Sequence, residues 1–124
     1  MYKINLAEKF SKISEFYKPK LVGELNGQHV KIAKLKGEFI WHKHDNEDEM
    51  FLIIKGKLLM ELRGENSKVS NIELNEGEFL IVPRGVEHKP VADEEVHLML
   101  FEPAGTLNTG DVENERTVKD VEKI

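Results

Sequence analysis

Short apolar segments alternate with turn-forming residues over most of this chain. The segments cover residues 21–25, 30–35, 39–44, 50–54, 57–62, 69–74, 79–82 and 96–101. They are separated by glycine-containing turns such as Asn26-Gly27, Lys55-Gly56 and Pro83-Arg84-Gly85. Short strands at this close spacing are typical of a sandwich or a barrel. No long helical pattern lies between them, which argues against a parallel α/β sheet. We therefore predict an all-β fold.

One helix is predicted before the first of these segments. Asn5 followed by Glu8 is a capping-box pattern. Apolar residues then recur at helical spacing until Pro19, at positions Leu6, Phe10, Ile13 and Tyr17. We expect a short amphipathic helix over about residues 6–17 that covers the barrel or a partner subunit.

The chain is predicted to have three parts. Residues 1–19 form a helical arm, residues 20–103 form the barrel, and residues 104–124 form a C-terminal tail. The last stretch of the tail is polar with scattered valines, so we expect it to be loosely docked or frayed.

The composition limits the classes of function. A length of 124 residues suits one domain with a single core. The net charge is -5 and no block of Lys or Arg occurs, so nucleic acid is not expected as a partner. The absence of cysteine excludes disulfides, thiolate metal ligands and a cysteine nucleophile.

Neither a signal peptide nor a membrane span is expected. The first ten residues contain no apolar core of a signal sequence, and the longest uninterrupted apolar run is residues 50–54. A cytoplasmic location is therefore the default expectation.

Four side chains form a candidate metal site. His42 and His44 are two residues apart in a segment with β character, so both imidazoles are expected on one face. Glu49 opens the next apolar segment, and His88 follows the turn after residues 79–82. Three imidazoles and one carboxylate suit a divalent first-row transition metal. The alternative is that these histidines are hydrogen-bonded barrel residues without a metal, and the two further donors in register favour the metal.

Two motifs in the sequence resemble those of the cupin superfamily. Gly37-x4-His42-x-His44-x4-Glu49-x6-Gly56 is similar to the first cupin motif, and Gly77-x5-Pro83-x-Gly85-x2-His88 is similar to the second. The resemblance covers roughly residues 28–102. Two positions depart from the pattern: Gly37 is one residue closer to the histidines, and Ala92 stands where the pattern has Asn.

The resemblance implies a small jelly-roll barrel in which one divalent ion is held by His42, His44, Glu49 and His88. The sequence from Glu102 to Gly110 is similar to small single-domain cupins grouped with mannose-6-phosphate isomerase. That grouping reflects kinship of fold and carries little weight as an activity. The metal is left open among Zn, Mn, Fe, Ni, Cu and Co.

Two classes of function remain open for such a site. As an enzyme, the protein would be a metal-dependent isomerase, oxygenase or lyase acting on a small oxygen-rich molecule. As a binding module, it would hold or sense a small sugar-like ligand without turning it over. A structural protein with an empty barrel is a third, weaker option. A homodimer is expected, because exposed edge strands and an apolar helix leave surface to bury.

His97 is a candidate catalytic base. His97 lies in the last strand on the same face as Glu95, Met99 and Phe101. If that face points inward, His97 would be a general base near the metal; otherwise it lies on the outer surface. Glu78, Glu95 and the acidic loop around Asp48 are the other candidates.

Overall fold

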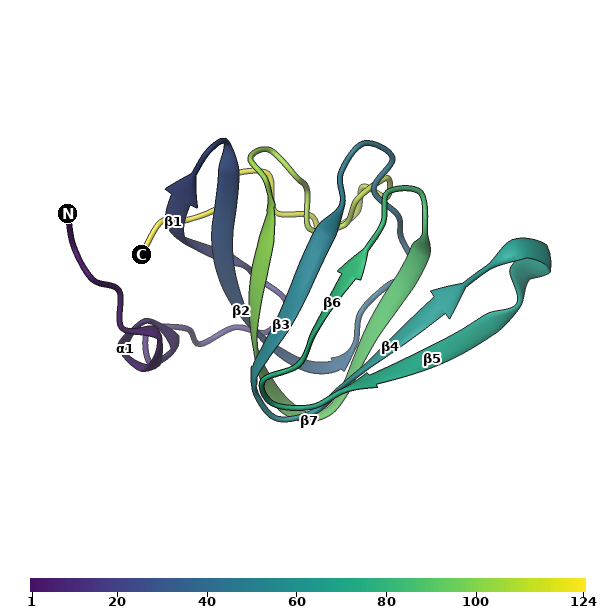
Figure 1. The fold of residues 1–124 in the computed structure, drawn as a ribbon, viewed down its shortest axis with the longest axis horizontal. Helices are drawn as coiled ribbons and strands as arrows, with labels where there is room; N and C mark the ends of the chain where they lie inside the picture. Colours follow the sequence, from purple (N-terminus) through teal and green to yellow (C-terminus); the bar gives the residue numbers. More distant parts are fainter.

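The computed structural model describes all residues, 1–124, and is almost entirely β-structure (Figure 1). A short 3₁₀ turn, Glu65–Ser67, joins two of the strands. The other elements, in chain order, are α1 (Leu6–Phe10), β1 (Lys20–Leu25), β2 (Gln28–Glu38), β3 (Glu49–Lys55), β4 (Leu58–Arg63), β5 (Val69–Leu74), β6 (Phe79–Val82) and β7 (Glu87–Pro103). The predicted all-β fold is confirmed.

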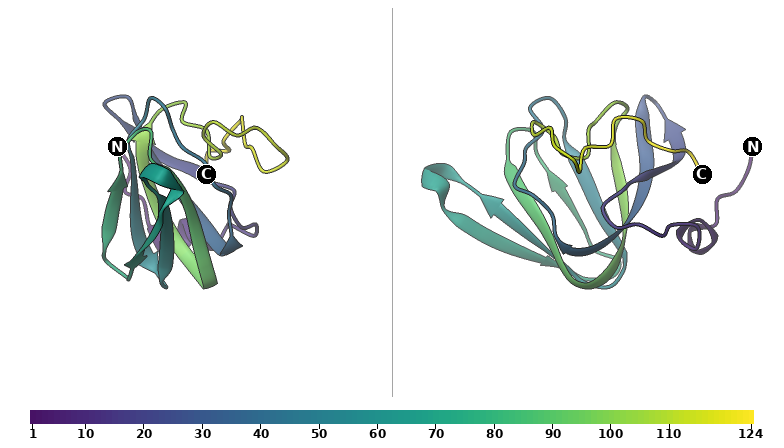
Figure 2. Two further views of the ribbon diagram at one scale, coloured as in Figure 1. Left: turned by 90° about the vertical axis from the view of Figure 1, so that its right-hand side faces the viewer. Right: turned by 180° about the vertical axis from the view of Figure 1, so that it is seen from behind.

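The long strand β7 organises the sheet. The strand order is β1-β2-β7-β3-β6, and all neighbours are antiparallel. The first part of β7 also pairs with β4, which in turn pairs with β5. β7 therefore bends from one set of partners to another, and Figures 1 and 2 show the strands curling around an enclosed space. A register shift between Leu35 and Gly37 of β2 adds to this curvature.

The enclosed space is filled by side chains from alternate positions of the strands. Along β3 the buried positions are Glu49, Phe51 and Ile53. Strand residues alternate between the two faces of a sheet, so these three side chains point inward together. The apolar core consists mainly of Ala33, Leu35, Phe51, Ile53, Leu58, Met60, Leu74, Val82, Val96, Leu98 and Leu100. Glu49 lies on the same inward face, opposite the core residue Val82 of β6, so its carboxyl group adjoins this apolar core.

The N-terminal helix is shorter than predicted. Asn5 caps it as expected, because its side-chain oxygen accepts a hydrogen bond from the Glu8 amide at 3.0 Å. The helix nevertheless ends at Phe10, and Tyr17 has a φ of 58°, which no α-helix contains. The predicted helix over residues 11–17 is wrong.

The helical spacing instead reflects contacts with the barrel. Phe10 and Ile13 pack with Val22 and Ile32 in a second, smaller apolar cluster. Tyr17 packs against the main core, and its amide donates to the Lys34 carbonyl at 2.8 Å. The apolar pattern identified the residues that pack on the barrel. Their backbone conformation is determined by tertiary contacts and not by helical propensity. None of the helices is long and apolar enough to span a membrane.

The C-terminal tail is docked more firmly than predicted. The Asp111 amide donates to the Lys43 carbonyl at 2.9 Å, and the Ile124 amide donates to the Leu21 carbonyl at 3.0 Å. Thr109 is completely buried. In Figures 1 and 2 this segment, drawn in yellow, crosses one end of the barrel. Side chains of the tail also reach the barrel: the Arg116 guanidinium donates to the Glu38 carbonyl at 3.0 Å, and Glu122 accepts from the Lys20 ammonium at 2.9 Å.

Candidate metal centre

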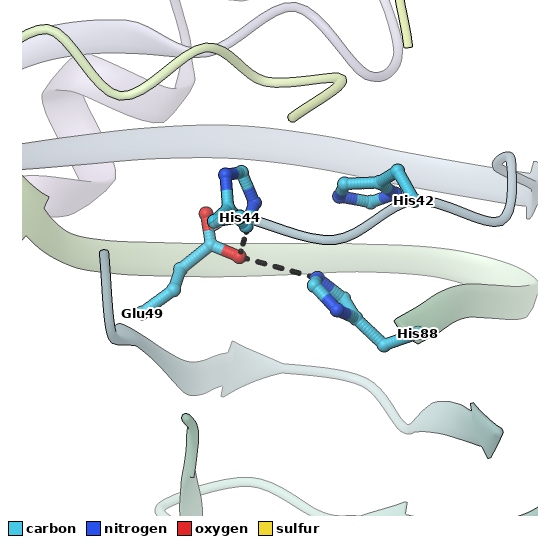
Figure 3. A group of neighbouring side chains, drawn as sticks. All are labelled: His42, His44, Glu49 and His88. Carbon is cyan, nitrogen blue, oxygen red and sulfur yellow. Dashed lines mark ion pairs between the residues drawn. The ribbon is translucent and has the colours of Figure 1, made fainter. Parts of the chain in front are cut away.

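The structure brings the four predicted donors together (Figure 3). The ligating atoms of His42, His44, Glu49 and His88 all lie within 4.8 Å of one another, and all four residues are buried. Glu49 opens β3 and His88 lies near the start of β7. The two other histidines lie on the segment between β2 and β3, which is a loop rather than the predicted strand.

Backbone hydrogen bonds hold that loop against β7 and the turn before it. The His42 amide donates to the His88 carbonyl at 3.1 Å, and the His88 amide donates to the His42 carbonyl at 2.9 Å. The Gly85 amide donates to the His44 carbonyl at 2.8 Å. The loop is thus fixed on both sides of Lys43, although it belongs to no regular strand. Backbone hydrogen bonds therefore fix the positions of both His42 and His44.

Hydrogen bonds set the orientation of two of the imidazoles. Nδ1 of His42 donates to the Ile40 carbonyl, and Nδ1 of His88 donates to the Val86 carbonyl, each at 2.9 Å. Because a carbonyl can only accept, these contacts place the ring proton on Nδ1 and leave Nε2 with its lone pair. Burial, with a smaller contribution from the charge of His88, lowers the pKa of His42 to about 4. His42 is therefore a neutral imidazole at pH 7, the form that binds metals.

The donor atoms of His44, Glu49 and His88 converge but do not form hydrogen bonds with one another. One carboxylate oxygen of Glu49 lies 3.3 Å from Nε2 of His44 and 3.4 Å from Nε2 of His88. All three atoms are buried and have no hydrogen-bond partner. Leaving a buried polar atom unpaired costs about 1–3 kcal/mol. A cation among these atoms would satisfy all of them, so the site fits a metal ion.

The charge of Glu49 also fits a ligand role. Burial alone would raise the pKa of this carboxyl, but the neighbouring side chains of Glu102, His44 and His88 hold it well below the usual range. For His44, burial lowers the pKa, but the adjacent Glu49 carboxylate reverses this and raises it. The carboxylate is thus ionised in the buried site. Three nitrogens and one oxygen could hold a divalent transition-metal ion, with one or two positions left for a further ligand.

A small cavity of about 40 Å³ adjoins His42 and Glu49. The remainder of its lining is mainly apolar: Tyr17, Pro19, Ala33, Leu35, Phe39, Phe51, Pro90, Leu98, Leu100 and Asn108. The rings of Tyr17 and Phe39 stack with centroids 4.7 Å apart, and the Tyr17 hydroxyl donates to the Gly37 carbonyl at 2.5 Å. Burial raises the pKa of Tyr17, so it stays a neutral phenol. The cavity therefore offers few polar groups besides the donors themselves.

Comparison with known proteins identifies the family. Residues 28–102 match the family model described as a cupin domain. The chain belongs to the cupin family. The predicted cupin barrel is confirmed, and the match includes both motifs and spans the range of the resemblance seen in the sequence.

This cupin is similar in sequence to two known proteins and similar in fold to an enzyme of known structure. A cupin-2 domain-containing protein from Shewanella frigidimarina is 40% identical, with a TM-score of 0.75 over 81% of this chain and 93% of that one. The uncharacterized protein YdbB of Bacillus subtilis is 31% identical over 68 residues, 55% of this chain and 57% of that relative's length. The cupin thus spans little more than half of the curated relative. Hydroquinone 1,2-dioxygenase PnpCD, solved with Fe³⁺, is 14% identical with a TM-score of 0.75 over 84% of this chain and 33% of that one, which shows a shared fold.

His97 is not part of the site of this cupin. Its neighbours Val96 and Leu98 face the core, so His97 faces the outside of the sheet. There its Nε2 lies 2.8 Å from a Glu95 carboxylate oxygen, and its ring stacks on Phe10 with centroids 4.5 Å apart. Of the two positions left open by the sequence, the outer one is observed. The suggestion that His97 is a base near the metal is therefore wrong.

The other predicted acid–base candidates also lie away from the cavity. Glu78 accepts a hydrogen bond from the Asn75 amide at 2.7 Å within an exposed turn. Asp48 accepts from the Arg84 amide at 2.9 Å and lies 3.3 Å from its guanidinium, so these two side chains satisfy each other. Neither residue lines the cavity beside the donors.

Sequence reasoning missed two buried charged residues next to the site. Glu102 and Lys31 are each 2% exposed, and the Lys31 ammonium lies 2.9 Å from a Glu102 carboxylate oxygen. Burial and the charge of Glu49 raise the pKa of Glu102 well above its usual range. Strand alternation could have found both residues. Glu102 continues the inward series of Leu98 and Leu100, and Lys31 precedes Ala33 in the same phase.

Proposed function

We propose that this cupin holds one divalent transition-metal ion through His42, His44, Glu49 and His88. The observation that carries the proposal is the convergence of three buried donor atoms, from His44, Glu49 and His88, that have no hydrogen-bond partner. The fixed Nδ1–H bonds of His42 and His88 support it, because they aim the basic nitrogen of each ring away from the backbone. When bound, the ion would supply Lewis acidity, or redox chemistry if it is iron, manganese or copper.

The proposed partner is a small molecule that presents an oxygen atom to the ion. The sequence suggested an oxygen-rich molecule. The lining of the cavity is mainly apolar, so it favours a ligand with few polar groups. Besides the donors, its polar groups are Asn108 and the already bonded Tyr17 hydroxyl. The part of the ligand that enters the cavity would therefore be apolar, with its oxygen group directed to His42 and Glu49. No lysine or arginine lines the cavity, so we do not extend the proposal to sugar phosphates.

The metal could serve either catalysis or binding in this cavity. The dioxygenase that shares the fold was solved with Fe³⁺, which makes iron and dioxygen chemistry the first activity to test. The alternative, a non-catalytic binding module, is favoured by the absence of a free acid or base. Apart from the proposed ligands His42 and Glu49, the only titratable group that lines the cavity is the bonded Tyr17 phenol.

A homodimer is also proposed for this cupin. Edge strand β6 pairs only with β3, and it exposes Phe79 and Ile81 by 59% and 53%. Exposed apolar side chains on an unpaired edge favour association with a second copy.

The proposed metal site is tested by elemental analysis of protein purified without chelator or affinity tag. We expect near-stoichiometric metal in the wild type and its loss in the His42→Ala/His44→Ala double variant. The ion found would then direct the assays, with iron pointing to dioxygen consumption and zinc to binding or isomerase assays. Wild-type protein that carries no metal and takes none up on incubation with Zn²⁺, Mn²⁺ or Fe²⁺ would overturn the proposal.

A further inference from the structure

Three charged side chains from neighbouring strands face one another inside the barrel. Lys31 lies on β2, Glu102 on β7 and Glu49 on β3. In the register of the sheet Lys31 is opposite Leu100, which makes it the diagonal neighbour of Glu102. Met50 is opposite Phe101, and the next step along both strands brings Glu49 opposite Glu102. Glu102 thus lies between the Lys31 ammonium and the proposed metal ligand Glu49.

The contact between Lys31 and Glu102 is shielded from solvent. The two side chains are 3% and 2% exposed, and they join residues 71 positions apart in the chain. The Lys31 ammonium also donates to the Thr106 carbonyl at 3.1 Å. One oxygen of Glu102 accepts a hydrogen bond from Lys31, and the other is buried and has no hydrogen-bond partner. This second oxygen has Glu49 as its neighbour, because the register of β3 and β7 places the two carboxyl groups side by side, and a proton shared between them would join Glu102 to Glu49.

Glu49 has one oxygen left for such a neighbour. Its Oε1 faces the imidazoles of both His44 and His88, and Figure 3 shows its second oxygen turned away from His88. A carboxylate that binds a metal through one oxygen can rotate unless another group holds it. Partners of this kind commonly orient metal-binding carboxylates, and their loss weakens metal binding.

We propose that Lys31 and Glu102 are positioning residues that hold the Glu49 carboxylate in the orientation needed for metal binding. This inference rests on the proposed metal site. Lys31 fixes Glu102 through the ion pair, and Glu102 in turn fixes Glu49. Thr106 extends the arrangement to the segment after β7, because its carbonyl accepts from Lys31.

Lys31 and Glu102 could instead only stabilise the fold. One double variant distinguishes this role from the positioning of Glu49. Removing one member of a buried ion pair leaves an uncompensated charge, whereas replacing both by apolar residues of similar volume is often neutral for stability. The Lys31→Met/Glu102→Leu double variant should therefore unfold near the wild-type temperature, although each single variant should be less stable. The double variant removes the group that holds Glu49, and because Lys31 and Glu102 are replaced together, neither is left without the other.

The experiment measures the affinity for Zn²⁺ by competition with a chelator, together with the absorption spectrum of bound Co²⁺, which reports ligand geometry. We expect the double variant to bind Zn²⁺ about 10–100-fold more weakly than wild type and to show an altered Co²⁺ spectrum. Glu102→Gln should retain most of the affinity, because its amide can donate to Glu49 while its carbonyl accepts from Lys31. Val22→Ala is the matched control, since this buried residue lies in the separate apolar cluster and its loss lowers stability alone.

The outcomes separate this inference from the metal site itself. Wild-type affinity and an unchanged Co²⁺ spectrum in the double variant would overturn the positioning role while leaving the metal site intact. A wild-type protein that binds neither ion would overturn both proposals. If the double variant does not fold, Glu102→Gln and Glu102→Ala provide the comparison, and equal affinity of these two variants would overturn the proposal.

Discussion

His42 and His88 exchange two backbone hydrogen bonds, N–H to carbonyl in each direction, at 3.1 and 2.9 Å. Their rings lie with centroids 4.3 Å apart. This pairing joins a loop to β7, the longest strand of the sheet, at the point where each supplies a proposed ligand. The separation of the two imidazoles is therefore set by the backbone, and the site should be largely formed before a metal arrives.

Removing the His88 imidazole should abolish tight metal binding. His88→Ala deletes a buried donor whose Nε2 has no other partner. We expect affinity for Zn²⁺ to fall by more than the roughly 10–100-fold typical of changes around a ligand. Chelator competition measures it. His29→Ala and His97→Gln are the matched controls, because both imidazoles lie outside the donor group. Unchanged affinity in His88→Ala would show that His88 is not a ligand.

The metal-free protein should lose stability on mild acidification. The pKa of His42 is about 4 in the fold, whereas an unfolded histidine titrates near 6.5. Between these values the unfolded state binds a proton that the folded state does not, so stability is complete above about pH 6.5 and falls toward pH 4. The loss from this residue is about 3 kcal/mol.

The test is urea denaturation of chelator-treated protein at several pH values. Other buried groups titrate in the opposite direction, as the raised pKa of His44 indicates. The comparison with His42→Gln isolates the His42 contribution, and the variant should show a flatter dependence on pH. Parallel curves for the two proteins would contradict the assignment of a neutral, buried His42.

Gly110 should tolerate no side chain. It has a φ of 56°, and an added Cβ would collide with the Lys43 carbonyl and approach the His42 ring to 3.1 Å. Gly110→Ala should therefore detach the tail from the loop and weaken metal binding as well as stability. Gly105→Ala is the matched control: its φ of 89° is also positive, but an added Cβ meets nothing within 4 Å. Backbone strain alone should cost it about 1–2 kcal/mol. Equal stability and equal Zn²⁺ affinity of the two variants would contradict this role of the tail.

The proposed dimer should depend on the exposed edge of β6. Phe79→Glu/Ile81→Glu places two charges on apolar positions of this edge strand and should give a monomer by light scattering coupled to gel filtration. Val69→Glu/Ile72→Glu makes the same change on β5, whose side chains at these positions are 47% and 37% exposed. A wild-type protein that is already monomeric, or dissociation only in the β5 variant, would contradict the proposed interface.

The grouping of the four donors could be predicted from the sequence, because it does not require that His42 and His44 lie in a strand. His42 and His44 lie in a loop and not in the expected strand, yet both rings still reach Glu49 and His88. The two motifs identify four side chains that the structure brings together, and they do so without specifying the backbone conformation of each segment. The strands themselves were predictable from alternation and turn residues, as the agreement at Phe79–Val82 illustrates.

The missed features depend on contacts between distant parts of the chain. A helical spacing such as that of Ile13 and Tyr17 does not distinguish a helix from an arm that packs at intervals on a barrel. The burial of Lys31 depends on Glu102, and neither residue is unusual in its local sequence. For His97, alternation defined two faces, but only the assembled sheet shows which one is inside.

The position of β7 near the end of the chain has a consequence for how the protein acquires its metal. Its pairings with β2 and β3 join segments far apart in sequence, such as His29 with Glu102. Contacts of this kind form late and slowly, because the intervening loop must be ordered first. His88 and Glu102 both belong to this strand, so neither can reach Glu49 until it docks. Metal loading would then follow folding, and added ions should slow unfolding while leaving the refolding rate unchanged.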